Sequence, residues 1–310
     1  MPRLITVTLN PAIDLVLEVP CLALGTTVRA VQRRFPSGKG VNVARAARTL
    51  GEAPIQLGLV GAAEEEAFRR AGAAFHPVAG ETRVNVTLVE RDRVTHIETQ
   101  GFSATATDVA DLSAALVVGP GDVVVFAGSA PTGVPPTVYR DLIRHCTRQG
   151  ARCILDSRGP ALVAGVQGPP WVVKPNEDEL ADLGFTASTE EGVLDAIRGL
   201  RRLGIGWVVV SLGARGVVAG SPEGWYRASH PAPSPVSAVG CGDALVAGIA
   251  VALLRNEPLS TALRLGTAAA VANLQCPGPC TFPAAEVSRL TESVTVERLE
   301  DDQPRKRLSP

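Results

Sequence analysis

A short glycine-rich segment near residue 240 contains the residue types that are best suited to chemistry. Gly240, Cys241, Gly242 and Asp243 lead directly into an apolar run that is typical of a buried helix. The first N–H groups of a helix lack helical acceptors, and with the helix dipole they favour anions. We therefore predict that Asp243 is a catalytic base for an attacking hydroxyl, beside an anion site made by the amides of Gly240, Cys241 and Gly242. The alternative is that Asp243 only caps the helix.

Two other interpretations of the glycine-rich segments fail on spacing. A dinucleotide-binding fingerprint needs a third glycine where this sequence has Leu245, and it needs a buried strand where residues 231–238 are rich in Pro and Ser. Gly38, Lys39 and Gly40 do not form a Walker-type loop, because neither Ser nor Thr follows the lysine. An oxidoreductase that uses a nicotinamide cofactor is therefore disfavoured.

The composition limits the partners of the chain. Its 310 residues carry 30 basic and 31 acidic side chains, a formal net charge of −1, and 4% aromatic residues. This balance favours neither nucleic acid nor an anionic membrane as a partner, so an anionic ligand must be bound by a local cluster of cations. The longest apolar run, residues 244–254, is shorter than the roughly 20 residues of a membrane span.

The N-terminus and the cysteines bear on location. Asp14 and Glu18 interrupt the first apolar run, which is unlike a signal peptide. Six cysteines without regular spacing are typical of a reducing compartment. We therefore expect a cytoplasmic protein.

Short apolar strands alternate with helical patterns along most of the chain. Strands are expected at 4–9, 123–127, 153–156, 171–174 and 207–212, and helices at 41–50, 137–149, 177–183, 189–203, 243–254 and 259–272. This alternation predicts an α/β protein with a mainly parallel central sheet and helices on both faces, a three-layer α/β/α arrangement. Such sheets bind ligands beyond the carboxyl ends of their strands.

Two more polar regions interrupt this alternation. Extended segments are expected at 13–20 with 27–35, and at 83–90 with 93–100. Val84, Val86 and Leu88 alternate with other residues in an imperfect period of two, which is typical of an antiparallel sheet with one solvated face. We predict a small accessory sheet that acts as a lid.

The predicted domain organisation is simple. Residues 1–299 should form a single domain with the lid segments, at about 13–35 and 83–100, inserted in it, and the charged residues 300–310 a flexible tail. The exposed edges of a lid sheet tend to pair with another strand, so a homodimer through the lid is expected.

Five motifs, taken in order along the chain, resemble the PfkB carbohydrate kinases of the ribokinase-like fold. They are TLNPAID at 8–14, PSGKGVNVA at 36–44, KPNEDEL at 174–180, VSLGARG at 210–216 and GCGD at 240–243. The first two, with ETRVNV at 81–86, are similar to the branch that acts on sugar phosphates and contains 1-phosphofructokinase and tagatose-6-phosphate kinase.

This resemblance implies ATP-dependent phosphorylation of a hydroxyl of a sugar phosphate, for example fructose 1-phosphate or tagatose 6-phosphate. Two alternatives stay open. One is a kinase of the same fold that acts on an unphosphorylated sugar or a nucleoside, and the other is a non-catalytic sugar-phosphate sensor.

The resemblance also implies roles for residues at the sugar. Asp14, Gly38 and Asn42 should bind sugar hydroxyls. The phosphate already present on the substrate should be bound by three cations, which are Arg29, Lys39 and Arg83. Chemistry agrees, because a dianionic substrate on a nearly neutral protein needs positive side chains that converge locally.

For the nucleotide, the resemblance implies contacts from Lys174, Asn176, Glu179, Ser211, Gly213, Ala214, Gly216 and Asn273. Asn176 and Glu179 would belong to the metal–phosphate network through water, and Asn273 would lie by the adenine. Mg²⁺ is implied because the triphosphate must be neutralised by an ion that prefers oxygen ligands. The expected partners are thus ATP, Mg²⁺ and a small sugar phosphate.

Several positions depart from the family pattern. Cys241 stands where the family usually has alanine, and a thiol at a helix N-terminus is expected to have a lowered pKa, which predicts sensitivity to oxidants. Thr87 stands where phosphosugar relatives often carry lysine, Glu64 stands where asparagine is expected, and the stretch 61–80 is shorter than usual. The last three changes bear on the substrate.

Overall fold

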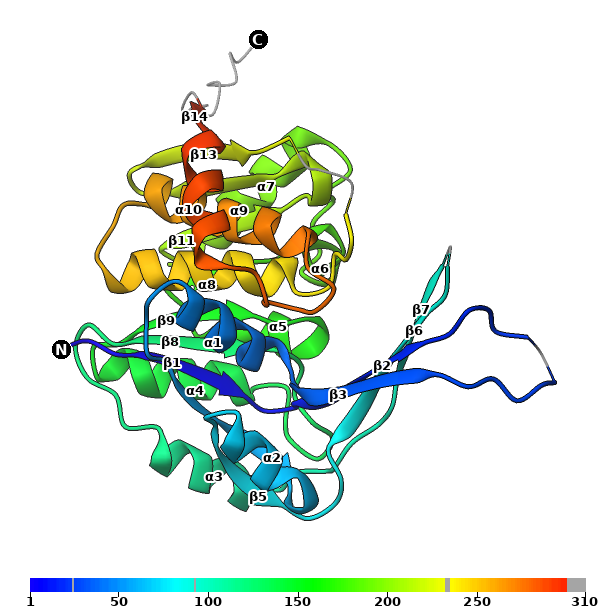
Figure 1. Ribbon diagram of the computed structural model, residues 1–310. Coiled ribbons are helices and arrows are strands. Elements are labelled where there is room, and N and C mark those ends of the chain that lie inside the picture. Colours follow the sequence, from blue (N-terminus) through cyan, green and yellow to red (C-terminus); the bar gives the residue numbers. More distant parts are fainter. Residues whose placement is uncertain (24, 92, 232–234, 300–310) are drawn as a thin grey trace, which may run out of the picture.

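The protein is described by a computed structural model that covers residues 1–23, 25–91, 93–231 and 235–299. The tail expected at 300–310 lies outside these residues. A ten-stranded sheet forms the centre of a layered core, and a separate four-stranded sheet projects from one side of it (Figure 1).

The large sheet is mainly parallel. In spatial order its strands are β14 (Thr295–Leu299), β13 (Gly224–Ser229), β12 (Val217–Ser221), β11 (Trp207–Ser211), β10 (Val172–Val173), β9 (Arg152–Asp156), β8 (Val123–Ala127), β1 (Leu4–Thr8), β4 (Ile55–Gly61) and β5 (Ala74–Val78). Neighbours from β5 to β11 pair in parallel, and those from β11 to β14 pair antiparallel. The predicted strands correspond to β1, β8, β9, β10 and β11, of which β10 is shorter than expected.

Helices cover both faces of this sheet. One face is covered by α1 (Lys39–Thr49), α8 (Cys241–Leu254), α9 (Leu259–Leu274) and α10 (Ala284–Ser293), and the other by α3 (Ala106–Ala115), α4 (Val138–Arg148), α5 (Gly159–Gly165), α6 (Glu177–Asp182) and α7 (Glu190–Arg202). Alternate residues of β8 enter the two cores, Val123 and Val125 on the first face and Val124 and Phe126 on the second. The predicted α/β/α layers are confirmed.

The short helix α2 (Glu65–Arg70) lies at the β5 edge of the large sheet. Its Phe68 is buried and stacks on Phe75 of β5, with ring centroids 5.2 Å apart. This small apolar cluster closes the edge of the core beside the lid.

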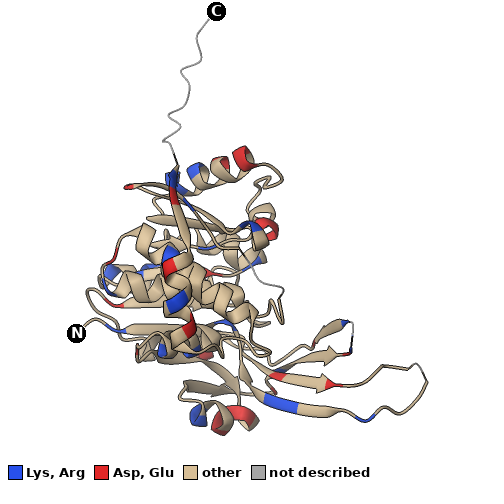
Figure 2. Cartoon of the chain, turned by 45° about the horizontal axis from the view of Figure 1, so that its top comes forward, with Lys and Arg blue, Asp and Glu red and all other residues tan. Residues whose placement is uncertain are grey.

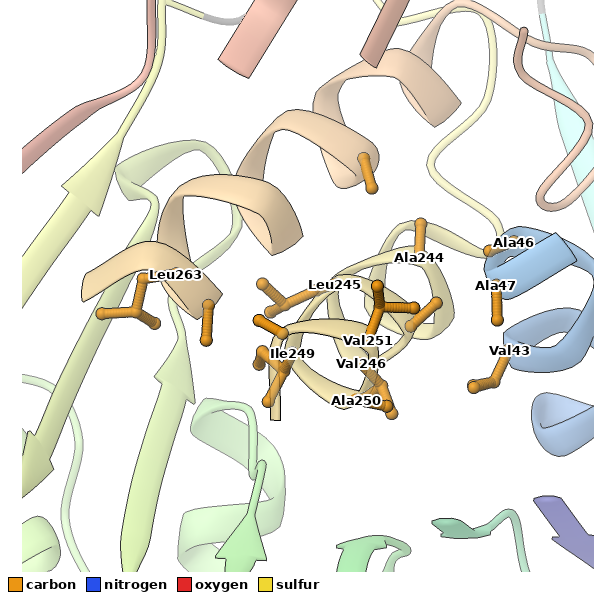
Figure 3. Close-up of a cluster of buried hydrophobic side chains, with 14 of the residues drawn as sticks. Val43, Ala46, Ala47, Ala244, Leu245, Val246, Ile249, Ala250, Val251 and Leu263 are labelled. Carbon is orange, nitrogen blue, oxygen red and sulfur yellow. The ribbon is translucent and has the colours of Figure 1, made fainter. Parts of the chain in front are cut away.

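The helix α8 is buried along almost its whole length, between α1 and α9. Figure 3 shows Val43 and Ala47 of α1 on one side of it and Leu263 of α9 on the other. The helices α8 and α9 approach each other closely at two glycines. An added Cβ at Gly248 of α8 would lie 2.4 Å from the Cα of Gly266 in α9. Such packing fixes α8 as a rigid support for the residues at its N-terminus.

The four-stranded lid sheet has the order β3 (Val31–Ser37), β2 (Ala12–Glu18), β6 (Arg83–Val89) and β7 (Val94–Glu98). The pairs β2–β3 and β6–β7 are antiparallel, and β2 and β6 join them in parallel. The predicted accessory sheet is present, although β3 begins at Val31 instead of near residue 27. Because β2 follows β1 almost directly, the base of the lid lies at the carboxyl end of the central strand.

Charged side chains of both signs are interspersed over the core and the lid (Figure 2). This distribution fits a local anion site better than a charged face. Within the described ranges, every helix is too short or too polar to cross a membrane. All six cysteines are free thiols.

Candidate active site

A cavity of about 940 Å³ opens at the carboxyl ends of the parallel strands, between the core and the lid. It lies where the strand order reverses, since the chain runs from β1 to β4 on one side and continues from β8 to β11 on the other. Open α/β sheets bind ligands at such a point. Most of the predicted site residues line it: Asp14, Gly38, Lys39, Asn42, Arg83, Lys174, Asn176, Glu179, Ser211, Gly213, Ala214, Gly216, Gly240, Cys241, Gly242 and Asp243.

Asp243 occupies the first turn of α8 and is 6% exposed. Its Oδ2 accepts a hydrogen bond of 2.8 Å from the side-chain amide of Asn42 in α1. Burial, followed by the nearby Asp156, raises the pKa of Asp243, whereas Lys39, the Asn42 hydrogen bond and Lys174 lower it, and the net result is a pKa of about 6. The carboxylate is thus largely ionised at neutral pH and is more basic than an ordinary aspartate, as a general base should be.

The main chain before Asp243 forms a tight turn into α8. Gly240 has a φ of 86°, a left-handed conformation, and among the described residues its N–H and that of Gly242 have no acceptor. The N–H of Cys241 instead donates to the carbonyl of Ala238 at 3.3 Å. The expectation of three free donors is therefore wrong at Cys241, because the turn that reverses the chain uses this group.

The Cys241 thiol does not have the low pKa that its position suggested. Burial raises the pKa, the hydrogen bond from Asn273 lowers it, and the nearby Asp243 and Cys276 raise it again. Burial and the two acidic neighbours raise the pKa more than the hydrogen bond lowers it. The expected lowered pKa is therefore wrong, and with it the physical basis for sensitivity to oxidants.

Arg45 is a residue of this site that sequence analysis did not single out. It lies in α1, and its guanidinium donates to Oδ1 of Asn42 at 3.0 Å, to the carbonyl of Pro279 at 2.9 Å and to the carbonyl of Pro36 at 3.1 Å. Because Arg45 occupies the oxygen of the Asn42 amide, the nitrogen faces Asp243. No local pattern marked this arginine, since its partners lie in three separate segments.

A fully buried carboxylate, Asp156 at the end of β9, pairs with both lysines of the cavity. Its Oδ1 lies 3.3 Å from Nζ of Lys39 and 3.2 Å from Nζ of Lys174. Burial would raise the pKa of Asp156, but the two lysines hold it below its usual value. Burial would lower the pKa of Lys39, whereas Asp156, Glu179 and Asp243 raise it. Lys39 is therefore a fixed positive charge beside Asp243. Sequence analysis did not single out Asp156, although its place at the end of a predicted strand could have indicated it.

Asn176 and Glu179 form a capping box at the start of α6. Oδ1 of Asn176 accepts from the N–H of Glu179 at 2.8 Å, and Oε2 of Glu179 accepts from the N–H of Asn176 at 2.9 Å. Oε1 of Glu179 lies 3.6 Å from Nζ of Lys39. One oxygen of Glu179 is thus engaged in the cap, and the other faces the cation in the cavity.

The lid contributes the polar groups at the other end of the cavity. Asp14 of β2 accepts a hydrogen bond of 3.0 Å from the amide of Asn85 in β6. Arg83, two residues earlier in β6, donates to the carbonyls of Asn10 and Pro11, each at 3.3 Å. These contacts hold the Arg83 guanidinium near Asp14, where the sequence predicted a sugar phosphate.

The opposite end combines a polar turn with an apolar wall. Ser211, Gly213, Ala214 and Gly216 form the turn after β11, and α9 contributes an apolar wall made of Ala270, Val271 and Leu274.

Asn273 does not line this cavity, so the expectation that it faces an adenine is wrong. It is fully buried, and its amide donates to the carbonyl of Val239 at 2.8 Å and accepts from the N–H of Cys280 at 2.6 Å. Adjacent positions on a helix point in directions about 100° apart, so Leu274 can line the cavity while Asn273 does not. Asn273 supports the turn before Asp243.

Three further positions lie outside the cavity. Arg29 is exposed in the connection between β2 and β3, so within one chain it does not reach the predicted phosphate site. Thr87 bonds to His96 on the next lid strand at 3.1 Å. Glu64 accepts from the N–H of Thr82 at 3.1 Å and so supports the base of the lid. Among these, only Arg29 was assigned to the site.

The chain is similar to known carbohydrate kinases over most of its length. The model of the family described as pfkB family carbohydrate kinase matches residues 8–285. The 1-phosphofructokinase of Escherichia coli (strain K12) is 38% identical over 282 residues, which cover 86% of this chain and 89% of that protein. The 1-phosphofructokinase of Rhodobacter capsulatus is 36% identical over 310 residues, 96% of this chain and 98% of that protein.

Solved structures show the same architecture. Phosphofructokinase-2 from Escherichia coli in complex with fructose-6-phosphate superposes with a TM-score of 0.86 at 26% identity, covering 94% of this chain and 99% of that chain. The ribokinase of Arabidopsis thaliana complexed with ribose and ATP has a TM-score of 0.74 at 22% identity over 94% of this chain and 99% of that chain, and so shows the fold. The ribokinase-like fold expected from the five motifs is confirmed.

Proposed function

This chain belongs to the pfkB family of carbohydrate kinases, and we propose that it uses ATP to convert fructose 1-phosphate to fructose 1,6-bisphosphate. Relatives named 1-phosphofructokinase, which are 34% to 38% identical, support this substrate. The observation that carries the proposal is the position of Asp243. This buried carboxylate, at the start of α8, faces a cavity with the lid cation Arg83 at one end and the turn after β11 at the other.

The proposed reaction is a direct, in-line phosphoryl transfer. Asp243 accepts the proton of the attacking sugar hydroxyl, and Asn42 holds the carboxylate in the orientation for this step. The N–H groups of Gly240 and Gly242 stabilise the charge that develops on the transferring phosphoryl group. Closure of the lid excludes water, which would otherwise compete for the phosphoryl group.

We also propose Mg²⁺ as the metal, bound mainly by ATP and water. Glu179 and Asn176 fit this role as hard oxygen donors at the cavity, and Oδ2 of Asp156 is a buried oxygen without a partner among the described residues. Among the residues that the structure describes, no cluster of three acidic, histidine or cysteine side chains could hold an ion by itself. When bound with ATP, the ion neutralises charge on the triphosphate.

A coupled assay of ADP release tests the substrate. Fructose 1-phosphate, tagatose 6-phosphate, fructose 6-phosphate and free fructose would be compared at equal concentrations. We expect the highest kcat/KM with fructose 1-phosphate. Equal or faster turnover of free fructose would disprove the assignment to a sugar phosphate, and the absence of ADP release with every sugar would favour a non-catalytic sensor.

We further propose a homodimer through the lid, in the cytoplasm. Val31 of β3 and Val94 and Ile97 of β7 are exposed apolar side chains on the two edge strands of the lid sheet. An exposed strand edge tends to pair, and pairing would bury these side chains. In such a dimer, the exposed Arg29 of one chain could reach the substrate phosphate in the cavity of the other chain. Sedimentation at micromolar concentration should show a dimer, and Ile97→Lys should convert it to a monomer.

A further inference from the structure

Three charged side chains from three segments meet at the lid end of the cavity. They are Arg83 in β6, Glu98 at the end of β7, and Arg158, which lies two residues after β9. Oε2 of Glu98 lies 3.5 Å from Nη1 of Arg83 and 3.3 Å from Nη2 of Arg158. A single carboxylate oxygen on the lid thus bridges one cation of the lid and one of the core.

The two guanidinium groups are close enough to affect each other. Burial lowers the pKa of Arg83, Glu98 raises it, and Arg158 lowers it again by repulsion. Without an anion between them these two groups would repel, so the position that Glu98 fills is an anion site. A phosphate monoester carries more charge than a carboxylate and has three terminal oxygens, so it can bind two arginines at once.

The three side chains differ in how firmly they are held. Arg83 is 14% exposed and its guanidinium also donates to the carbonyls of Asn10 and Pro11. Glu98 is 55% exposed and lies on the edge strand of the lid, so it can turn toward water at little cost. Arg158 is 60% exposed and reaches the cavity from the core.

We propose that Arg158 binds, together with Arg83, the phosphate group that the substrate already carries, and that Glu98 occupies this place until the substrate displaces it. This inference rests on the proposed function, because it specifies how that site selects a phosphorylated sugar.

The same contacts could instead be only a clasp between the lid and the core. The two explanations predict opposite results. For a clasp, removal of either charge breaks the same ion pair, so Glu98→Gln and Arg158→Gln should change substrate binding in the same direction. For a phosphate site, Arg158 is a ligand and Glu98 is a competitor, so the two substitutions should act in opposite directions.

The test is the KM for fructose 1-phosphate in both variants, with Arg255→Gln as control. Arg255 is also an exposed arginine in an ion pair, with Glu52, and it lies outside the cavity. We expect Arg158→Gln to raise this KM about tenfold, with kcat and the KM for ATP within about twofold, since charge-assisted contacts at exposed groups are moderate. Glu98→Gln should lower the same KM, and Arg255→Gln should leave it unchanged.

Titration of inorganic phosphate by calorimetry tests the phosphate site separately from the proposed function, because phosphate binding is measured without turnover. The affinity for phosphate should fall in Arg158→Gln and rise in Glu98→Gln. If both variants shift in the same direction, or if Arg158→Gln changes neither KM nor phosphate affinity, the phosphate site is disproved. If no sugar phosphate is turned over, the proposed function fails, and the titration alone decides whether the anion site exists.

Discussion

The side-chain amide of Asn42 donates a hydrogen bond of 2.8 Å to Oδ2 of Asp243, which lies 201 positions later in the sequence. This bond connects α1 to α8, two of the helices that begin at the cavity. It stabilises the ionised carboxylate, while burial has the opposite effect and is the larger contribution. The balance leaves Asp243 with a pKa of about 6, ionised at neutral pH and still basic enough to accept a proton.

The acid limb of the pH profile should report this balance. Because the base must be ionised, kcat/KM, which reports the free enzyme, should fall as the pH decreases through about 6. In Asn42→Ala the hydrogen bond that lowers the pKa of Asp243 is lost, so the limb should move to higher pH. The wild type and Asn42→Ala would be measured with the same substrates, so the titration of the substrates affects both profiles equally and does not contribute to the difference between them. A limb at the same pH in both would show that another group controls it.

Asp243→Asn should separate activity from stability. Loss of the base should reduce kcat by about 10²- to 10⁴-fold. Because folding raises the pKa of Asp243 above its ordinary value, the ionised carboxylate opposes folding increasingly as the pH rises from about 4 to about 6, and fully above that range. The neutral variant should therefore melt at the same or a higher temperature at pH 7.5. Turnover near the wild-type value would remove Asp243 from the mechanism.

Arg45→Gln should weaken catalysis through the orientation of Asn42. The variant loses contacts to Asn42, Pro36 and Pro279, so we expect kcat to fall about tenfold, a lower melting temperature, and an acid limb at higher pH. A purely structural role would lower the melting temperature and leave the acid limb in place.

The matched control is Arg48→Gln, an exposed arginine on the same helix whose contact is the carbonyl of Gly72. It should keep the wild-type kcat and pH profile. Arg45→Lys restores the charge but not the three-way contact, and it should recover only part of the activity. Full recovery would mean that charge alone matters and that Asn42 is not positioned by Arg45.

Local patterns were enough to predict the core of the fold and the position of Asp243. The apolar strands and the glycine-rich start of α8 are short-range signals, and the rule that ligands bind at the carboxyl ends of parallel strands brought their polar residues together. Several elements gave no such signal. The strand β5 contains Pro77, which is unusual inside a strand, and β12 to β14 lie in an antiparallel extension of the sheet that no alternation with helices marks.

The errors within the site have a common cause, which is tertiary packing. Asn273 is fully buried against the turn before Asp243, and burial raises the pKa of Cys241 although this residue begins a helix. Arg45 connects Asn42 to Pro279, which is distant in sequence, and Asp156 pairs with two lysines from other segments. Motifs predict which residue types are needed, whereas orientation and burial depend on how the helices pack.

Gly240→Ala tests whether the turn before Asp243 needs a glycine. The residue has a φ of 86°, and an added Cβ would lie 2.7 Å from Cβ and 2.9 Å from Cα of Pro279. A side chain there must therefore strain the backbone or displace the loop at Pro279, at a cost of about 1–3 kcal/mol. We expect a lower melting temperature together with a loss of kcat, because the displaced turn carries the anion-binding N–H groups. Gly242→Ala is the control for stability, since its nearest neighbour would be Nζ of Lys174 at 3.8 Å. Equal melting temperatures of the two variants would show that the turn tolerates a side chain and that its conformation is not what holds the anion site.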